Sequence, residues 1–233
     1  MRKAIRQDKP WQAVFRVVRG SGKIVWIQAT ARPSREINGK VLWNGVLMDI
    51  TRQKETEGRL EYMALHDPLT GLGNRTFFME RLSQALSQAS RYNHLVGLVY
   101  LDLNGFKEVN DSLGHQAGDQ VLVEAATRIW QSLRKSDVPC RMGGDEFSVL
   151  LPEMKDQAEA YNVARKILDN MSGVLHLNPE TTVSLSASIG ISIFPDHAED
   201  KDRLIYEADQ AMYRAKISGG RMLIKTAGTE KDH

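Results

Sequence analysis

Apolar and polar residues alternate along three segments near the start of the chain. These segments are WQAVFRVVR (11–19), GKIVWIQATARP (22–33) and GKVLWNGVLMDIT (39–51), and the turn-forming runs GSG and SREING separate them. Alternation with a period of two residues predicts half-buried β-strands. Three antiparallel strands without a helix bury little apolar surface, so we expect residues 1–50 to form part of a larger unit.

The pattern changes abruptly at Thr51. The segment TRQKETEGRLEYMALHD is highly charged, rich in helix formers and free of proline, and it predicts a connecting helix over 51–66. Ile50, Glu57, Leu60 and Ala64 fall at roughly heptad spacing. Too few of the heptad positions are apolar for the pattern alone to predict a coiled coil.

Helical and strand-like patterns alternate through the rest of the chain. A nearly continuous apolar run, VGLVYLDL (96–103), predicts a strand that is buried on both faces. The other predicted elements are helix 75–92, helix 118–133, a hairpin over 138–152, helix 157–171, strand 182–194, a helix around 201–217 and strand 221–225. This order predicts an α+β fold whose sheet is covered mainly on one face, followed by a tail at 227–233.

Composition adds a few constraints. The chain has 233 residues and a net charge of +2, which fits one or two ordinary globular domains and gives no sign of a nucleic-acid or membrane-surface partner. Its one cysteine, Cys140, lies in an apolar strand pattern and is predicted to be a core residue. Because no run is long and apolar enough to span a bilayer and no signal peptide is evident, we expect a cytosolic protein or the cytosolic part of a longer one.

Two adjacent acids stand at the turn of the predicted hairpin. Gly143 and Gly144 suit a tight turn because glycine adopts positive φ at little cost, whereas Asp145 and Glu146 repel each other and serve no purpose in a turn. Taken alone, the two acids are typical of a solvated hairpin tip. Asp102, however, ends the most buried strand, where a carboxylate is costly unless a cation meets it.

If the hairpin lies beside that strand, Asp102, Asp145 and Glu146 meet at one edge of the sheet. Clustered carboxylates favour Mg²⁺ or Mn²⁺, which are hard cations that prefer oxygen ligands. Divalent ions bridge carboxylates and phosphates when a nucleotide α-phosphate is attacked. The three acids therefore predict a nucleoside triphosphate as substrate.

Six motifs occur in order over residues 67–225, and together they resemble the GGDEF family of diguanylate cyclases. They are DPLTGLGNR (67–75), LDLNGFKEVND (101–111), GHQAGDQVL (114–122), RMGGDEF (141–147), SASIGIS (186–192) and ADQAMYRAK (208–216). The resemblance implies a domain over 67–226 with a palm-like sheet, of the kind found in nucleotide cyclases and polymerases, flanked by helices. It also implies a homodimer that condenses two GTP molecules into cyclic di-GMP and two pyrophosphates.

The resemblance also implies a role for individual positions. Asp102 and Asp145 would bind the metal together with the Leu103 carbonyl, and Glu146 would bind a second metal or help to deprotonate the ribose 3′-hydroxyl. The positions that would contact the substrate are Asn110 and Asp119 for guanine, Gly105, Phe106, Lys107 and Lys216 for phosphate, and Gly143 and Gly144 at the acidic turn. Without the family, Asn110 with Asp111 is typical of a simple turn, and both lysines are typical of solvated faces.

RKSD (134–137) matches the inhibitory RxxD motif of the family. The resemblance implies that Arg134 grips a phosphate of cyclic di-GMP and stacks on guanine, while Asp137 accepts a hydrogen bond from a guanine edge. Arg165 lies on the next predicted helix, where the family often has a second product-binding arginine. Without the family, Arg134 and Asp137 are equally consistent with a surface ion pair that contributes little.

Residues 10–50 resemble the last three strands of a PAS sensor domain, with DIT (49–51) before the charged helix. Two positions depart from the GGDEF pattern. Gly73 replaces a proline, which we expect to loosen a turn, and AKISGGRM (215–222) carries an extra glycine, so Arg221 is not assigned to phosphate. A catalytically silent GGDEF module that binds GTP or cyclic di-GMP as a receptor, or regulates a neighbouring domain, is the alternative to an active cyclase. The intact GGDEF turn favours the cyclase.

Overall fold

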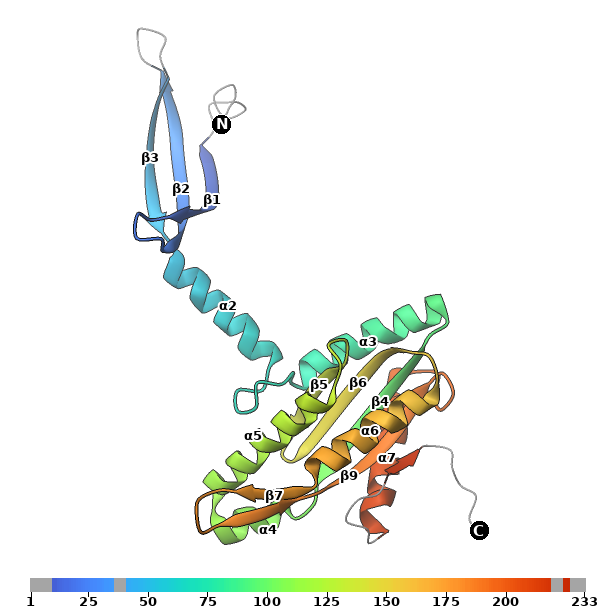
Figure 1. Ribbon diagram of the computed structural model, residues 1–233. Coiled ribbons are helices and arrows are strands. Elements are labelled where there is room, and N and C mark those ends of the chain that lie inside the picture. Colours follow the sequence, from blue (N-terminus) through green and yellow to red (C-terminus); the bar gives the residue numbers. More distant parts are fainter. Residues whose placement is uncertain (1–9, 36–40, 219–223, 227–233) are drawn as a thin grey trace. The chain divides into compact units, whose positions relative to one another are not determined.

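The structure, a computed structural model, describes residues 10–35, 41–218 and 224–226. The chain divides into two compact units, residues 1–62 and 63–233, and Figure 1 shows the helices and strands of each. Within the described ranges, no helix combines the length and the apolar character needed to cross a bilayer.

The first unit contains a three-stranded antiparallel sheet in the order β1-β2-β3, as the alternating pattern predicts. Its strands are β1 Trp11–Val18, β2 Ile24–Arg35 and β3 Val41–Asp49. Val25, Ala29 and Ile50 are buried, but the neighbouring residues Val46 and Leu47 are 65% and 72% exposed. Because neighbours on a strand point to opposite faces, both faces of this sheet carry exposed apolar side chains in the part of the unit that is described.

The connecting helix α2, Thr51–Leu65, confirms the helix predicted after the third strand. Its start is fixed by hydrogen bonds, since the Trp26 N–H donates to Thr51 Oγ1 over 2.8 Å and that hydroxyl donates to Asp49 Oδ1 over 2.6 Å. The helix buries none of its residues, so local pairs such as Lys54–Glu57, at 2.7 Å, support it in place of a core.

The second unit is built on a five-stranded sheet in the order β10-β9-β4-β6-β5. Its strands are β4 Leu95–Leu103, β5 Val138–Gly143, β6 Glu146–Met154, β9 Ala187–Phe194 and β10 Ile224–Thr226. The central strand β4 pairs antiparallel with β6 and β9, and β10 pairs parallel with β9. Every residue of β4 after Leu95 is buried, as its apolar run predicts.

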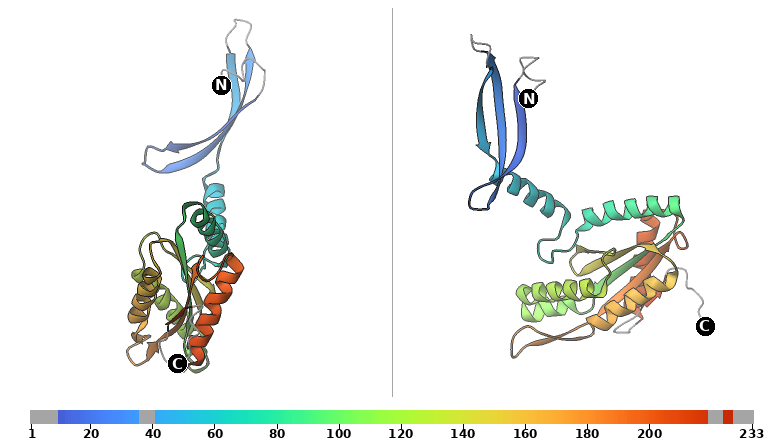
Figure 2. Two further views of the ribbon diagram at one scale, coloured as in Figure 1. Left: turned by 90° about the vertical axis from the view of Figure 1, so that its right-hand side faces the viewer. Right: turned by 45° about the horizontal axis from the view of Figure 1, so that its top comes forward.

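Helices cover both faces of this sheet, so the prediction of a sheet covered mainly on one face is wrong (Figure 2, left). The helices are α3 Arg75–Tyr92 and α7 Lys201–Ile217 on one face, and α5 His115–Ser132 and α6 Gln157–Met171 on the other. Leu98 of β4 packs with Leu82 and Leu204, whereas its neighbour Val99 packs with Ile129 and Ile167. The periodicity predicts where the helices lie in the sequence, but it does not specify which face of the sheet each helix covers.

The predicted strand 182–194 is two strands in two different sheets. It breaks at Ser186 into β8 Thr182–Leu185 and β9, and β8 forms a separate hairpin with β7 Gly173–His176. The Ser186 carbonyl accepts a hydrogen bond from the Asn104 N–H over 3.0 Å. The prediction of one continuous strand was wrong. The alternation of apolar residues continues past Ser186, but the backbone changes its partner strand there.

Two buried serines, on the two strands that flank β4, allow a test of how this core tolerates polar groups. The Ser148 hydroxyl is buried and has no hydrogen-bond partner among the described residues, whereas the Ser192 hydroxyl donates to the Leu204 carbonyl over 2.7 Å. We expect Ser148→Ala to raise the free energy of unfolding by about 1 kcal/mol, because it removes an unpaired buried hydroxyl. Ser192→Ala should lower it by a similar amount.

Thermal unfolding followed by circular dichroism measures both serine variants. A change of 1 kcal/mol corresponds to a shift in melting temperature of about 2–4 °C in a domain of this size. A lower melting temperature for Ser148→Ala would show that the hydroxyl contributes a stabilising contact.

Candidate active site

The pairing of β4 with β6 brings the predicted acids together. Asp102 and Glu146 are directly opposite in the register of the two strands, and the Leu103 N–H donates to the Asp145 carbonyl over 3.3 Å. Asp102 is 7% exposed, and both acids of the turn are half-buried. The pairing therefore places Asp102 beside Glu146, with Asp145 in the adjoining turn.

A lysine from the last turn of α7 partly compensates the charge of these acids. Lys216 Nζ lies 2.6 Å from Asp102 Oδ1, so this exposed lysine is paired with an acid of the candidate site. Burial raises the pKa of Asp102 above its usual value, and the charge of Asp145 raises it further, although Lys216 acts in the opposite direction. The hydrogen bond to Asp102 raises the pKa of Lys216, which therefore stays charged. The edge carries more negative charge than this lysine neutralises.

Tyr100 fixes the side chain of Glu146. Its hydroxyl donates to Glu146 Oε2 over 3.1 Å from a position on β4 that is 7% exposed. Burial and the charge of Glu146 raise the pKa of Tyr100, so this hydroxyl remains a donor. Sequence reasoning missed this residue. The period-two pattern could have revealed it, because Tyr100 and Asp102 lie on the same face of one strand.

Arg141 ties the acidic turn to the motif that precedes α3. Its Nε and one terminal nitrogen donate to the Gly144 carbonyl over 3.0 and 2.8 Å, and the other lies 3.2 Å from both carboxylate oxygens of Asp67. Burial raises the pKa of Asp67, but hydrogen bonds from Thr70 and the charge of Arg141 outweigh burial and lower it. Asp67 and Arg141 lie in motifs that the sequence analysis noted without a role, and here they hold the turn in place.

The turn and the start of α4 leave backbone groups open to a ligand. Gly143 and Gly144 have φ of 148° and 53°, and no atom lies within 4 Å of where a Cβ would be. Gly105, at φ 76°, precedes the helix α4 Phe106–Leu113, and no side chain caps the first turn of that helix. Free N–H groups at a helix N-terminus favour anions, and Lys107 beside them is exposed. The arrangement suits the phosphate role that the resemblance implies.

The two positions expected to read guanine lie on adjacent helices. Asn110 is in α4, so the reading of residues 110–111 as a simple turn is wrong, and Asp119 is an exposed residue in the first turns of α5. A Cβ on Gly118 would lie 2.1 Å from Asn110 Oδ1. Only glycine at 118 therefore leaves room for the Asn110 side chain. A glycine inside a helical pattern was the signal that sequence reasoning did not use.

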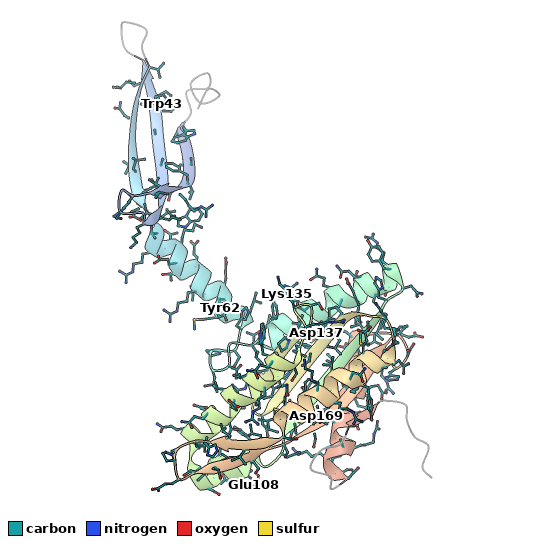
Figure 3. All side chains as sticks on the ribbon, in the orientation of Figure 1. Trp43, Tyr62, Glu108, Lys135, Asp137 and Asp169 are labelled. Atoms are coloured by element: carbon teal, nitrogen blue, oxygen red, sulfur yellow. The ribbon has the colours of Figure 1, made fainter. Side chains whose placement is uncertain are left out.

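The RKSD residues form a network of their own before β5. The side-chain Nε of Arg134 donates to one carboxylate oxygen of Asp137 over 2.8 Å, and the backbone N–H of Arg134 donates to the other over 3.1 Å. A terminal guanidinium nitrogen of Arg134 donates to Glu159 over 3.0 Å. The Asp137 side chain is fully buried. Figure 3 shows Lys135 and Asp137 well separated from Glu108 of α4. Arg165 is exposed on α6, with its guanidinium 5.9 Å from the ring centre of Tyr161.

Comparison with known proteins identifies this architecture. The family model "Diguanylate cyclase, GGDEF domain" matches residues 64–222, and a PAS fold model matches residues 1–47. The chain belongs to the GGDEF family. It is 45% identical over 165 residues to "Diguanylate cyclase TpbB" of Pseudomonas aeruginosa, an alignment that covers 71% of this chain and 38% of that protein. The chain thus spans less than half the length of this relative.

Solved structures agree with the family assignment. The GGDEF domain of TpbB from Pseudomonas aeruginosa matches with a TM-score of 0.67 and 44% identity, over 70% of this chain and 94% of that one. The coiled coil and GGDEF domain of DgcB from Caulobacter crescentus, solved in complex with cyclic di-GMP, matches with a TM-score of 0.68 and 27% identity, over 76% and 93% of the two chains. Both likenesses support the α+β fold expected from the sequence.

One departure from the GGDEF pattern has a structural explanation. The Gly73 N–H donates to the Pro139 carbonyl over 3.3 Å, and a Cβ at this position would lie 2.4 Å from Phe77 and 2.7 Å from the Cys140 sulfur. Gly73 therefore packs closely against β5, in a place with no room for a side chain. Cys140 is buried, as predicted. Arg221 lies outside the described residues.

The oxygen atoms at the acidic edge of the GGDEF domain suit a divalent metal. In the described part of the chain, no three His, Cys, Asp or Glu side chains are close enough together to hold a metal by themselves. Magnesium in nucleotide enzymes is commonly held by one or two carboxylates, with waters and substrate phosphates as the other ligands. Asp102 and Asp145 match that requirement, and the residual negative charge around Asp102 favours a cation there.

Asp102 should reduce the stability of the fold at neutral pH. Because its pKa is raised, the ionised form is less favourable in the folded than in the unfolded chain. We expect Asp102→Asn to raise the melting temperature of the GGDEF domain at pH 8, because the substitution removes this unfavourable charge. This gain should shrink as the pH falls towards 4 and the wild-type carboxylate takes up a proton.

Melting curves between pH 4 and pH 8 measure this dependence. Asp119→Asn removes an exposed carboxylate and serves as the control, with little change in melting temperature expected. A lower melting temperature of Asp102→Asn at pH 8 would mean that the ion pair with Lys216 outweighs the cost of burial.

Proposed function

We propose that this chain is a diguanylate cyclase, which condenses two GTP molecules into cyclic di-GMP and two pyrophosphates. The observation that carries the proposal is the placement of Asp102 opposite Glu146, with Asp145 in the turn beside them. The open N-terminus of α4 provides a neighbouring place for phosphates. The activity named for the relative TpbB supports the same reaction.

In this proposal each chain binds one GTP and the reaction takes place in a homodimer. Asn110 and Asp119 bind guanine, while the first N–H groups of α4, Lys107 and Lys216 bind the phosphates. The Lys216 side chain is 46% exposed, so it can exchange Asp102 for a phosphate oxygen. The backbone of Gly143 and Gly144 lets the substrate approach the acids closely.

Each ribose 3′-oxygen forms a bond to the α-phosphorus of the GTP held by the facing chain. The bond between that phosphorus and the oxygen that bridges to the β-phosphate breaks, and pyrophosphate leaves. Mg²⁺ or Mn²⁺, held by Asp102, Asp145 and the Leu103 carbonyl, would neutralise the α-phosphate and make the 3′-hydroxyl more acidic. In this proposal Glu146, which accepts a hydrogen bond from Tyr100, takes the hydroxyl proton or binds a second ion.

Incubation with GTP and Mg²⁺, followed by chromatography, tests the proposal. We expect the wild-type protein to form cyclic di-GMP, and Asp145→Asn to lower the rate by about 10²-fold or more, because a charge is lost without a change in volume. The control is Asp169→Asn, an exposed acid on α6 that Figure 3 labels. A wild-type protein that binds GTP or cyclic di-GMP but forms no product would instead be a silent receptor or regulator.

We further propose that cyclic di-GMP inhibits the enzyme at Arg134 and Asp137. A surface pocket of about 350 Å³ adjoins this pair. It is lined on the α6 side by Glu159, Asn162, Val163 and Lys166, with Arg165 not among its lining residues. Since both oxygens of Asp137 are engaged by Arg134, a guanine reaches this carboxylate only if Arg134 turns away from it. Arg165 is assigned to a second protein surface, which a bound product dimer would link to the first.

Progress curves with and without added cyclic di-GMP test the feedback. Arg134→Ala should leave the initial rate nearly unchanged, because Figure 3 shows the labelled neighbours of Arg134 far from α4, but the late slowing of the reaction should disappear. Arg134→Lys keeps the charge and loses the bidentate geometry, and it should restore inhibition only in part. Identical slowing of wild type and both variants would mean that RKSD is only a surface ion pair.

A further inference from the structure

Trp130 is a large aromatic side chain that the fold does not bury. It lies in the last turns of α5 and is 63% exposed, whereas tryptophan is highly buried on average. It is also the only tryptophan in the sequence after residue 43. No part of the proposed reaction uses it.

The surface is hollowed beside Trp130. A pocket of about 450 Å³, here called the Trp130 pocket, is lined by Trp130, Leu133, Arg134, Lys135, Asp137 and Pro139. The pocket of about 350 Å³ described above shares Leu133, Arg134 and Asp137 with it and continues to α6. Arg134 and Asp137 therefore border two hollows, each within the usual size range of small-molecule sites.

The chemistry of the Trp130 pocket combines an aromatic face with positive charge. Lys135 is exposed, and Arg134 is 46% exposed at its side chain. Asp137 is the only acid that lines this pocket among the described residues, and its carboxylate is already paired with Arg134. An aromatic face beside two cations fits a flat heterocyclic base attached to phosphate.

A protein partner fits this surface less well. The exposed residues next to Trp130 on α5 include Thr127 and Gln131, which are polar and flank a third hollow together with the Thr70–Leu72 segment. The cores of protein interfaces are contiguous apolar patches depleted of charge. Here a single aromatic side chain stands between polar and cationic residues.

We infer that Trp130 is a base-stacking platform of the product site, on which one guanine of cyclic di-GMP stacks while Arg134 and Lys135 bind its phosphates. The inference rests on the proposed function and adds to it a residue and a pocket outside the RxxD motif. A ligand with two purine bases can then occupy both hollows, with Arg134 between them. Of the RKSD residues, Arg134 and Lys135 supply positive charge to the Trp130 pocket.

The test compares cyclic di-GMP binding to the full chain by calorimetry. Trp130→Leu keeps an apolar side chain but removes the aromatic face, and it should weaken binding by at least about fivefold, whereas Trp130→Phe should recover most of the affinity. Tyr92→Leu is the matched control, because Tyr92 is an aromatic residue of similar exposure, 62%, on α3. All three variants should keep the wild-type initial rate with GTP.

Intrinsic fluorescence gives a second readout. Cyclic di-GMP should quench the wild-type signal, and in Trp130→Leu the quenching should disappear, leaving the constant background of Trp11, Trp26 and Trp43. Melting curves establish whether the variants fold. If Trp130→Leu does not fold, Trp130→Phe still tests the inference.

Three results would overturn the inference, and they separate it from the proposed function. If Trp130→Leu binds cyclic di-GMP as tightly as wild type while Arg134→Ala does not, the RxxD site acts without Trp130. If the wild type forms cyclic di-GMP but does not bind it at this surface, both the feedback and the platform fail while the cyclase stands. If Trp130→Leu weakens binding of another protein but not of cyclic di-GMP, the surface is a docking site.

Discussion

The register between β4 and β6 places Asp102 opposite Glu146, and every other part of the candidate active site is arranged around that pair. A strand buried on both faces is apolar on both, so hydrophobicity alone does not prevent a slip by one residue. Shape does so here. Gly97 of β4 lies under the Met154 side chain, and a Cβ at Gly97 would be 2.8 Å from the Met154 sulfur.

A second close approach brings the positive charge to this edge. A Cβ on Gly190 of β9 would lie 2.0 Å from the Ala208 carbonyl and 2.2 Å from the Met212 nitrogen, so glycine allows α7 to pack directly on the strand. The last turn of α7 then carries Lys216 to within 2.6 Å of Asp102. The ion pair at the acidic edge thus depends on a glycine of a neighbouring strand. A larger residue at Gly97 or Gly190 would therefore shift β4 or α7 and disturb the site, although neither glycine contacts the acidic residues.

Local patterns determine the parts of this structure that the sequence could predict. The helices 75–92 and 157–171 and the buried strand follow from periodicity, and the acidic turn follows from glycines beside acids that no turn requires. What could not be predicted depends on contacts between distant residues. Examples are the change of strand partner at Ser186, the close packing of Gly73 on β5, and the pairing of Lys216 with Asp102. Single-sequence patterns contain no information on such partners.

The same helix carries a position proposed to bind guanine and the position proposed to bind the product. Asp119 lies near the start of α5 and Trp130 near its end, and eleven residues of helix separate them by about 16 Å. A ligand that stacks on Trp130 therefore does not occupy the place proposed for guanine. Inhibition from that surface has to act through the position of whole elements, either along α5 and β5 or by holding two GGDEF domains apart. Since α5 and β5 each pack tightly against the sheet, α5 in the core on one face and β5 in the core on the other, a rigid displacement of the domain is the simpler of these two routes.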